Sequence, residues 1–241
     1  EIAPDLIINA AAYTAVDKAE SEPQAAARVN ADAPGVVAEC ASELGAGLIH
    51  YSTDYVFDGN ASSPYKEDDP TNPQSVYGRT KLDGENAVLN SGASALILRT
   101  AWVYSLHGHN FLKTMLRLAA VRDELTIVAD QVGSPTSTLA LTDATIRLIE
   151  YFVEHDGFPA EVRGVYHMTC EGETSWAGFA RAIIAASNDS DTRVTDITTA
   201  DYPTPAARPA YSVLCGDKLD RVFGIRLPDW EDALDTCMTG Q

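Results

Sequence analysis

The stretch that decides the fold is Gly47-Leu48-Ile49-His50-Tyr51-Ser52-Thr53-Asp54, an apolar run that ends in hydroxyl and carboxylate side chains. Short continuous apolar runs are typical of strands buried on both faces of a parallel sheet. Ligands of open α/β sheets bind at the carboxyl ends of such strands. The sequence therefore predicts a buried parallel strand that delivers Thr53 and Asp54 to a ligand crevice. Read without its context, the same Thr-Asp pair is equally compatible with a simple strand cap and turn.

Similar elements lie on both sides of this stretch. Strands are expected over residues 6–12, where the run ends in small side chains, and over 95–100; helices are expected over about 22–44 and 75–89. Strand, helix and strand at this spacing favour βαβ crossovers and an open parallel sheet covered on both faces. The predicted fold class is α/β, with a Rossmann-like doubly wound sheet.

The second half of the chain has a looser pattern. Helices are expected over 110–121, up to about 152 and from 174 onward, with short strands over 125–129 and 165–168. This pattern indicates a smaller α+β lobe that lies over the sheet. We expect residues 1–104, with 137–169 returning to them, to form a dinucleotide-binding domain, and 105–136 with 170–241 to form mainly a substrate-binding lobe.

Composition narrows the function classes. The 241 residues carry a net charge of −18, with 35 acidic against 17 basic side chains, which disfavours nonspecific binding to nucleic acid or to an anionic membrane. No apolar run approaches the roughly 20 residues of a membrane span, and no signal-peptide pattern is found. The four cysteines show no CxxC spacing and no cluster with histidine. We expect a soluble cytoplasmic protein with reduced thiols and no assigned metal ligands.

Tyr77-Gly78-Arg79-Thr80-Lys81 has the YxxxK spacing. On a helix, residues i and i+4 share one face, so the Lys81 ammonium is expected beside the Tyr77 phenol. A neighbouring positive charge favours the phenolate and brings the group closer to useful proton transfer. A surface Tyr-Lys pair is the alternative, and only the position of Tyr77 some 24 residues after Thr53 favours a catalytic pair.

Six segments together resemble the dTDP-4-dehydrorhamnose reductases, a branch of the extended short-chain dehydrogenases/reductases. They are residues 9–20, 52–59, 77–85, 99–104, 130–136 and 202–209. The resemblance runs in order from the first residue to about Trp230. It implies reduction of the C4 ketone of a dTDP-linked keto-deoxysugar, with NADPH as cofactor and NADH as the alternative, for the synthesis of cell-surface polysaccharide.

The resemblance also implies roles for individual residues. Tyr77 would be the general acid, Lys81 would lower its pKa and hold the nicotinamide ribose, and Thr53 would orient the substrate carbonyl. Cofactor contacts would come from Asn9, Ala10, Ala11 and Ala12, whose small side chains let the cofactor lie close to the backbone. Substrate contacts would come from Val16, Asp54, Tyr55, Trp102 and Arg208. His50 and His167 lie within apolar strands and are expected to be core histidines.

Two departures from the family pattern stand out. Tyr211 occupies a position where the family usually has Asn, which puts that nucleotide contact in doubt. No GxGxxG motif occurs in the chain, so we expect that about fifty residues which would cradle the cofactor pyrophosphate are missing before Glu1. Some family members bind Mg²⁺ at a dimer contact, so Mg²⁺ and a homodimer are possible, with no ligand residues assigned.

Two other functions stay open. Another nucleotide-sugar reductase or epimerase would use the same Tyr-Lys pair. A non-catalytic regulatory subunit, related to that of methionine adenosyltransferase, belongs to a different class. The presence of Thr53, Tyr77 and Lys81 favours catalysis over regulation.

Overall fold

The computed structural model describes residues 3–187 and 191–240. The main sheet in this part of the chain has the strand order β1-β2-β3-β8, and every neighbouring pair is parallel. Its strands are β1 (Leu6–Asn9), β2 (Gly47–Thr53), β3 (Ser94–Thr100) and β8 (Gly164–His167). The predicted α/β fold class with a parallel sheet is confirmed, and β2, the strand that decides it, lies between β1 and β3.

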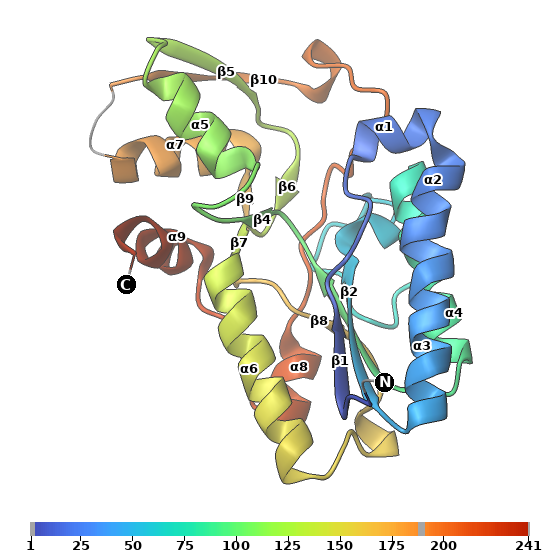
Figure 1. Cartoon of the computed structure of the whole chain (residues 1–241). Helices are drawn as coiled ribbons and strands as arrows, with labels where there is room; N and C mark the ends of the chain where they lie inside the picture. The colour runs from blue at the N-terminus through green and yellow to red at the C-terminus, as the bar shows by residue number, and fades with distance from the viewer. Residues whose placement is uncertain (1–2, 188–190, 241) are drawn as a thin grey trace.

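Helices cover both faces of this sheet (Figure 1). They are α3 (Ala33–Leu44) and α4 (Val76–Asn90) on one face and α6 (Thr138–Glu154) on the other. Alternate residues of β2 serve the two layers, since Leu48 packs in a cluster with Ala41 of α3, whereas Ile49 packs with Leu148 of α6. Burial on both faces explains why the strand is apolar without alternation.

A second group of elements lies beyond the carboxyl ends of the strands (Figure 1). It contains the parallel pair β5 (Glu124–Val128) and β10 (Arg193–Ile197), with α5 (Phe111–Ala119) and α7 (Trp176–Ser187) packed against it. Smaller pairs are β4 (Val103–Tyr104) with β7 (Thr136–Ser137), and β6 (Val132–Gly133) with β9 (Thr174–Ser175). The last helices are α8 (Asp217–Phe223) and α9 (Trp230–Thr239).

Three local features differ from the sequence-based expectation. The strand expected over 6–12 ends at Asn9, because the Asn9 side chain accepts a hydrogen bond from the Ala11 amide and turns the chain out of the sheet. The helix expected over 22–44 is composed of α2 (Pro23–Ala27), a π-helical turn over 28–32 and α3. An additional short helix, α1 (Val16–Ser21), precedes it.

Strand β10 was not predicted either. Its sequence, Arg193-Val194-Thr195-Asp196-Ile197, carries little apolar signal because its side chains are only partly buried or exposed.

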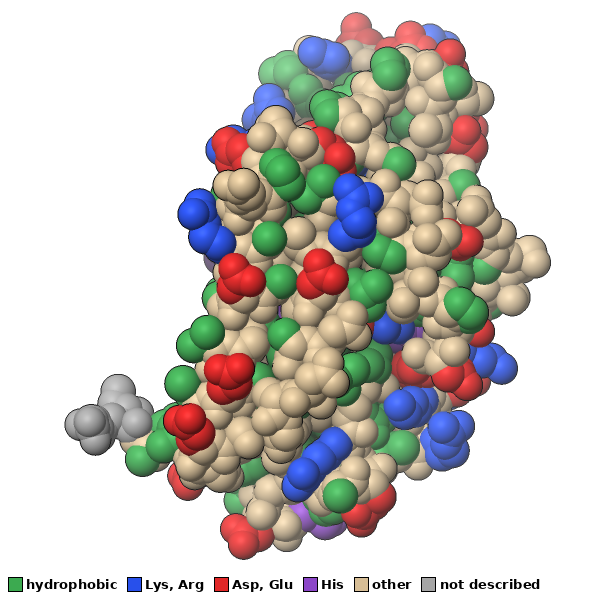
Figure 2. Space-filling model, turned by 90° about the vertical axis from the view of Figure 1, so that its right-hand side faces the viewer, with side chains coloured by type: hydrophobic (Ala, Val, Ile, Leu, Met, Phe, Trp, Pro, Cys, Tyr) green, Lys and Arg blue, Asp and Glu red, His purple; other side chains and the backbone are tan. Residues whose placement is uncertain are grey.

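The surface carries charges of both signs, and the space-filling view of one face shows acidic and basic side chains interspersed (Figure 2). No helix among the described residues is long and apolar enough to cross a membrane.

Candidate active site

Helix α4 brings Tyr77 to the end of β2. The Ser75 hydroxyl caps the helix by accepting from the Gly78 amide at 3.1 Å. A Cβ atom on Gly78 would lie 2.2 Å from the Tyr55 carbonyl oxygen, so this glycine permits close contact with the short 3₁₀ turn over 54–56 that follows β2. As a result the Tyr55 and Tyr77 rings meet edge to face, with centroids 5.5 Å apart.

Lys81 lies one turn further along the same helix and is 2% exposed. Its Nζ atom donates a hydrogen bond to the Tyr51 carbonyl oxygen of β2 at 2.6 Å. Burial disfavours the charged form and lowers the pKa of Lys81 to about 8, whereas the Glu85 carboxylate acts in the opposite direction. Tyr77 and Lys81 therefore have the i, i+4 spacing on one helix, and the Lys81 ammonium is anchored to the strand that carries Thr53.

The expected lowering of the Tyr77 pKa is wrong in its net direction. Burial of the phenol raises the pKa of Tyr77 to about 12, the nearby Thr53 side chain lowers it, and the Asp54 charge raises it. Removal from water outweighs the favourable contacts because the phenolate, not the phenol, carries the charge. The phenol is thus held in its protonated form, which suits a proton donor.

Thr53 and Asp54 are buried where β2 ends. Thr53 caps the following turn by accepting from the Tyr55 amide at 3.2 Å, and its hydroxyl donates to Asp54 Oδ1 at 2.9 Å. The cap and turn considered from the sequence are therefore present. Burial raises the pKa of the Asp54 carboxyl to about 6, and the side chains of Ser212 and Thr53 act in the opposite direction.

Asn30 is a buried residue that the sequence-based reasoning did not identify. It lies in the π-helical turn, where its Oδ1 accepts from the Tyr13 amide at 2.8 Å and its Nδ2 donates to Thr80 Oγ1 at 3.2 Å. A Cβ atom on Gly84 would lie 2.0 Å from the Asn30 carbonyl oxygen. Asn30 therefore connects helix α4 to the loop after β1. A π-turn at such a contact is a frequent mark of functional sites.

The predicted cofactor residues begin with Asn9, the last residue of β1, and continue into the loop after it. The side-chain nitrogen of Asn9, Nδ2, lies 3.1 Å from His50 Nδ1. Ala10 and Ala11 are exposed. With methyl side chains only, this loop leaves its backbone open to a flat ligand lying against it.

We call Thr53, Tyr77 and Lys81, the three residues predicted to be catalytic, the catalytic corner. A cavity of about 560 Å³, which we call the recognition cavity, is lined mainly by the second group of elements, with Tyr55 from the turn after β2 and Asp17 from α1. Its lining is Asp17, Tyr55, Phe111, Thr114, Met115, Leu118, Arg122, Leu125, Thr126, Ile127, Val128, Gln131, Trp176, Ile197, Tyr202, Thr204 and Arg208. Tyr55 belongs to this lining and its ring contacts that of Tyr77, which is itself not among the lining residues.

Only some of the predicted substrate residues line this cavity. Tyr55 and Arg208 do, whereas Val16 is the first residue of α1, directly before the lining residue Asp17. Asp54 is the buried first residue of the turn after β2. None of the described lining residues is Trp102, which instead stacks on one of them.

Trp102 has an unusual conformation. Its φ is 48°, a left-handed value that bulky residues rarely adopt. Its ring stacks on Trp176 with centroids 3.5 Å apart and an interplanar angle of 4°. A Cβ atom on Gly133 would lie 2.5 Å from Trp102 Cε2, so a glycine is needed beside the ring. Backbone strain of this kind clusters at ligand sites. Trp102 is connected to the cavity through Trp176, which stacks on it and lines the cavity.

Two arginines supply positive charge to the recognition cavity. Arg208 Nη2 donates to Asp17 Oδ2 at 2.8 Å, and Arg208 Nη1 donates to the Ala206 carbonyl oxygen at 3.2 Å. Arg122, which the sequence did not single out, is exposed and lines the same cavity. Guanidinium groups suit phosphate oxygens because they donate in pairs.

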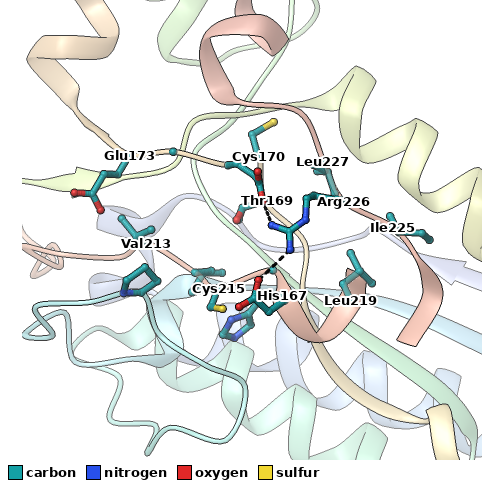
Figure 3. A pocket seen from close by; sticks show the side chains of 16 residues that line it. His167, Thr169, Cys170, Glu173, Val213, Cys215, Leu219, Ile225, Arg226 and Leu227 are labelled. Carbon is teal, nitrogen blue, oxygen red and sulfur yellow. Dashed lines mark hydrogen bonds and ion pairs between the residues drawn. The ribbon is translucent and has the colours of Figure 1, made fainter. Parts of the chain in front are cut away.

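A second cavity, of about 380 Å³, lies at the end of β8 (Figure 3). Arg226 lines it, but its guanidinium is already paired with Glu171 and with Asp217 at 3.0 Å. None of the described residues lining this cavity was predicted as a site residue. Arg226 is bound by three carboxylates, whereas Arg208 is bound by one, Asp17, and Arg122 adds a second guanidinium to the recognition cavity. The recognition cavity is therefore the better candidate for a phosphate-bearing ligand.

Other expected features can be placed as well. His50 and His167 are completely buried in their strands, and burial lowers the pKa of each to about 3, as expected for neutral core histidines. The four cysteines are free thiols. Tyr211 donates its hydroxyl to Glu173 at 2.7 Å. In residues 3–187 and 191–240, no group of three or more His, Cys, Asp or Glu side chains could hold a metal ion.

Comparisons with known proteins agree with this arrangement. A family model described as the RmlD substrate binding domain matches residues 1–241. A dTDP-4-dehydrorhamnose reductase of Sinorhizobium fredii is 51% identical over 236 residues, which cover 97% of this chain and 79% of the relative.

Two solved structures are similar over almost the whole chain. The dTDP-4-dehydrorhamnose reductase of Clostridium acetobutylicum gives a TM-score of 0.90 at 42% identity and covers 98% of this chain and 80% of that one. The Bacillus anthracis enzyme, solved in complex with NADP, gives 0.92 at 36% identity, with 100% and 82% covered.

Proposed function

Since the chain belongs to the family described as the RmlD substrate binding domain, we propose that it reduces the C4 ketone of dTDP-4-dehydro-L-rhamnose to dTDP-L-rhamnose with NADPH, for cell-surface polysaccharide synthesis. One juxtaposition carries the proposal. The protonated Tyr77 phenol touches Tyr55, and Tyr55 lines a cavity that also contains two arginines. A proton donor is thus placed next to a space that suits a phosphate-bearing ligand.

The cofactor fits the chain at the end of β1. The exposed loop of Ala10 and Ala11 offers uncovered backbone, and Lys81, with three N–H donors of which one binds Tyr51, can hold a ribose hydroxyl. When bound, NADPH supplies the hydride that reduces the carbonyl carbon. A solved relative in complex with NADP supports the choice of cofactor. We assign residues 1–104 and 137–169 mainly to cofactor binding and the remaining segments mainly to the substrate.

Side chains of the protein carry out the proton transfer. Tyr77 donates its phenolic proton to the carbonyl oxygen as negative charge develops there. The Lys81 ammonium, anchored on Tyr51, stabilises the phenolate that is left. Thr53 releases Asp54 and donates its hydroxyl to the same oxygen, which orients the ketone. Since this chemistry needs ordered donors away from bulk water, the buried setting of the corner supports it.

Substrate recognition belongs to the recognition cavity. Arg208 and Arg122 contact the diphosphate, and the aromatic side chains of Phe111 and Trp176 provide apolar surface for the base or sugar. Asp17 holds Arg208 in place until the phosphate shares its donors. We keep the expected cytoplasmic location, where NADPH and sugar nucleotides are available.

The test is direct turnover. The protein is mixed with NADPH and dTDP-4-dehydro-L-rhamnose, NADPH consumption is followed by absorbance, and the product is identified by NMR. We expect stoichiometric formation of dTDP-L-rhamnose. Turnover only with the UDP-linked sugar would favour another nucleotide-sugar reductase. No NADPH consumption with any keto sugar, together with binding of a methionine adenosyltransferase, would favour the regulatory-subunit alternative.

A further inference from the structure

A cluster of buried charged side chains lies directly beneath the Tyr77 and Lys81 pair, and the mechanism above does not use it. Glu85 is 1% exposed and Arg99 is 3% exposed. Glu85 follows Lys81 by four residues, so Tyr77, Lys81 and Glu85 lie along one face of α4. Ionised side chains are rarely buried so deeply unless they are paired, so this cluster needs an explanation.

Glu85 joins three elements of the fold. Arg99 of β3 donates to Glu85 Oε2 from Nη2 at 2.7 Å and to Oε1 from Nε at 3.0 Å. The Ser52 hydroxyl of β2 also donates to Glu85 Oε1. Ser52 and Arg99 are partners in the parallel register of β2 and β3. The Glu85 carboxylate therefore holds α4 against the carboxyl ends of β2 and β3.

The residue held by Glu85 is flanked by two parts of the catalytic corner. Before Ser52 stands Tyr51, whose carbonyl oxygen accepts from Lys81, and after it stands Thr53. A shift of Ser52 would move both the anchor of the ammonium and the hydroxyl that orients the ketone. Misplacement of catalytic groups by even about 1 Å costs large factors in rate.

Charge gives a second reason. Lys81 and Arg99 are both buried cations, and the Glu85 carboxylate is the charge that favours the ammonium form of Lys81. His50 on β2 is a further titratable group that interacts with Lys81, and Tyr77 lies one turn before Lys81 on α4. Both are uncharged at neutral pH, because burial raises the pKa of Tyr77 to about 12 and lowers that of His50 to about 3.

We propose that Glu85 is a positioning residue, which holds the end of β2 against α4 and keeps the Lys81 ammonium charged for proton transfer at Tyr77. The part of this inference that concerns turnover rests on the proposed function. The part that concerns Lys81 does not, and it can be measured without substrate.

The first experiment follows the lysine side chains by NMR during a pH titration of the full chain. The sequence has five lysines, and a Lys81→Arg variant assigns the signal of Lys81. Glu85→Gln keeps the shape of the side chain and removes its charge. We expect the Lys81 pKa to fall by about one unit or more in Glu85→Gln. The matched control is Asp83→Asn, an exposed position on the same helix, where we expect no shift.

An unchanged Lys81 titration in Glu85→Gln would overturn the proposal. If this variant does not fold because Arg99 is left unpaired, the double variant Glu85→Gln with Arg99→Met removes both charges. Glu85 is the charge that acts on Lys81, so the double variant is still expected to titrate below the parent. A Lys81 pKa equal to that of the parent would also overturn the proposal.

The second experiment measures the pH profile of kcat. Loss of the Lys81 charge should move the basic limb of Glu85→Gln to lower pH, in step with the NMR shift, while Glu85→Asp keeps the limb of the parent. A merely structural role would lower the melting temperature and reduce kcat at every pH without moving the limb, and this result would contradict the proposal. Absence of turnover in the parent would instead refute the proposed function, and the NMR titration would still decide the role of Glu85.

Discussion

The catalytic corner and the recognition cavity are built in opposite ways. In the corner, the side chains come from one helix and one strand, and Thr53 and Lys81 are at most 5% exposed. In the cavity, the two arginines come from loops 86 residues apart, and Arg122 is exposed. On the proposed function, the groups that transfer the proton come from rigid elements, whereas the two arginines proposed to bind phosphate come from loops. Variants in the first region should therefore change kcat, and variants in the second should change KM.

The largest expected effect is that of Tyr77→Phe. It removes the proton donor and keeps the ring that contacts Tyr55, so kcat should fall about 10²- to 10⁴-fold. KM for the sugar nucleotide and the melting temperature should change little. Steady-state kinetics and thermal denaturation check this expectation, and near-normal turnover would rule out Tyr77 as the proton donor.

The next effect separates the two cavities. Arg208→Met removes a guanidinium from the recognition cavity, and KM for the sugar nucleotide should rise about 10- to 100-fold, the range of a lost charge-assisted hydrogen bond. Arg226→Met is the matched control, because Arg226 lies in the second cavity and is paired with carboxylates there. A larger increase in KM for the control than for Arg208→Met would move the nucleotide site to the second cavity.

Gly84→Ala tests the close contact between α4 and Asn30, which packs against the helix that carries Tyr77 and Lys81. Its Cβ would lie 2.0 Å from the Asn30 carbonyl oxygen, which belongs to the backbone, so the helices must separate. We expect the free energy of unfolding to fall by about 1–3 kcal/mol, as for other overpacked sites. Chemical denaturation measures it, with Gly216→Ala as the control because nothing lies within 4 Å of that Cβ position. Equal stability of the two variants would show that the contact between α4 and Asn30 yields easily.

The smallest effect is expected at Trp102. Trp102→Ala removes the stack on Trp176, and KM for the sugar should rise about 3- to 10-fold, in line with the worth of an aromatic pair, while KM for NADPH should change less. Equal changes in both Michaelis constants, together with a large drop in melting temperature, would indicate core packing instead.

The sequence predicted the two regions to different extents. Strand β2 and the Tyr77–Lys81 pair were readable because a buried strand has a continuous apolar pattern and because i and i+4 share a helix face. That Arg122 and Trp176 line the recognition cavity could not be predicted, because the cavity brings together segments more than fifty residues apart in the chain.

The net pKa shift of Tyr77 could not be predicted from the YxxxK motif either. YxxxK predicts a cation near the phenol, but the net direction of the Tyr77 pKa depends on burial, and burial is decided by the packing of α4 on the turn after β2. Asn30 was missed for a similar reason. Its neighbours Tyr13 and Thr80 lie 17 and 50 residues away in the sequence, and no local pattern marks a π-turn.

The division between chemistry and recognition is tested most directly by kcat and KM of Tyr77→Phe and Arg208→Met, measured together with saturating NADPH. The account predicts that Tyr77→Phe loses kcat with KM for dTDP-4-dehydro-L-rhamnose nearly unchanged, and that Arg208→Met raises this KM with kcat nearly unchanged. The reverse pattern, in which Arg208→Met loses kcat and Tyr77→Phe mainly raises KM, would contradict it.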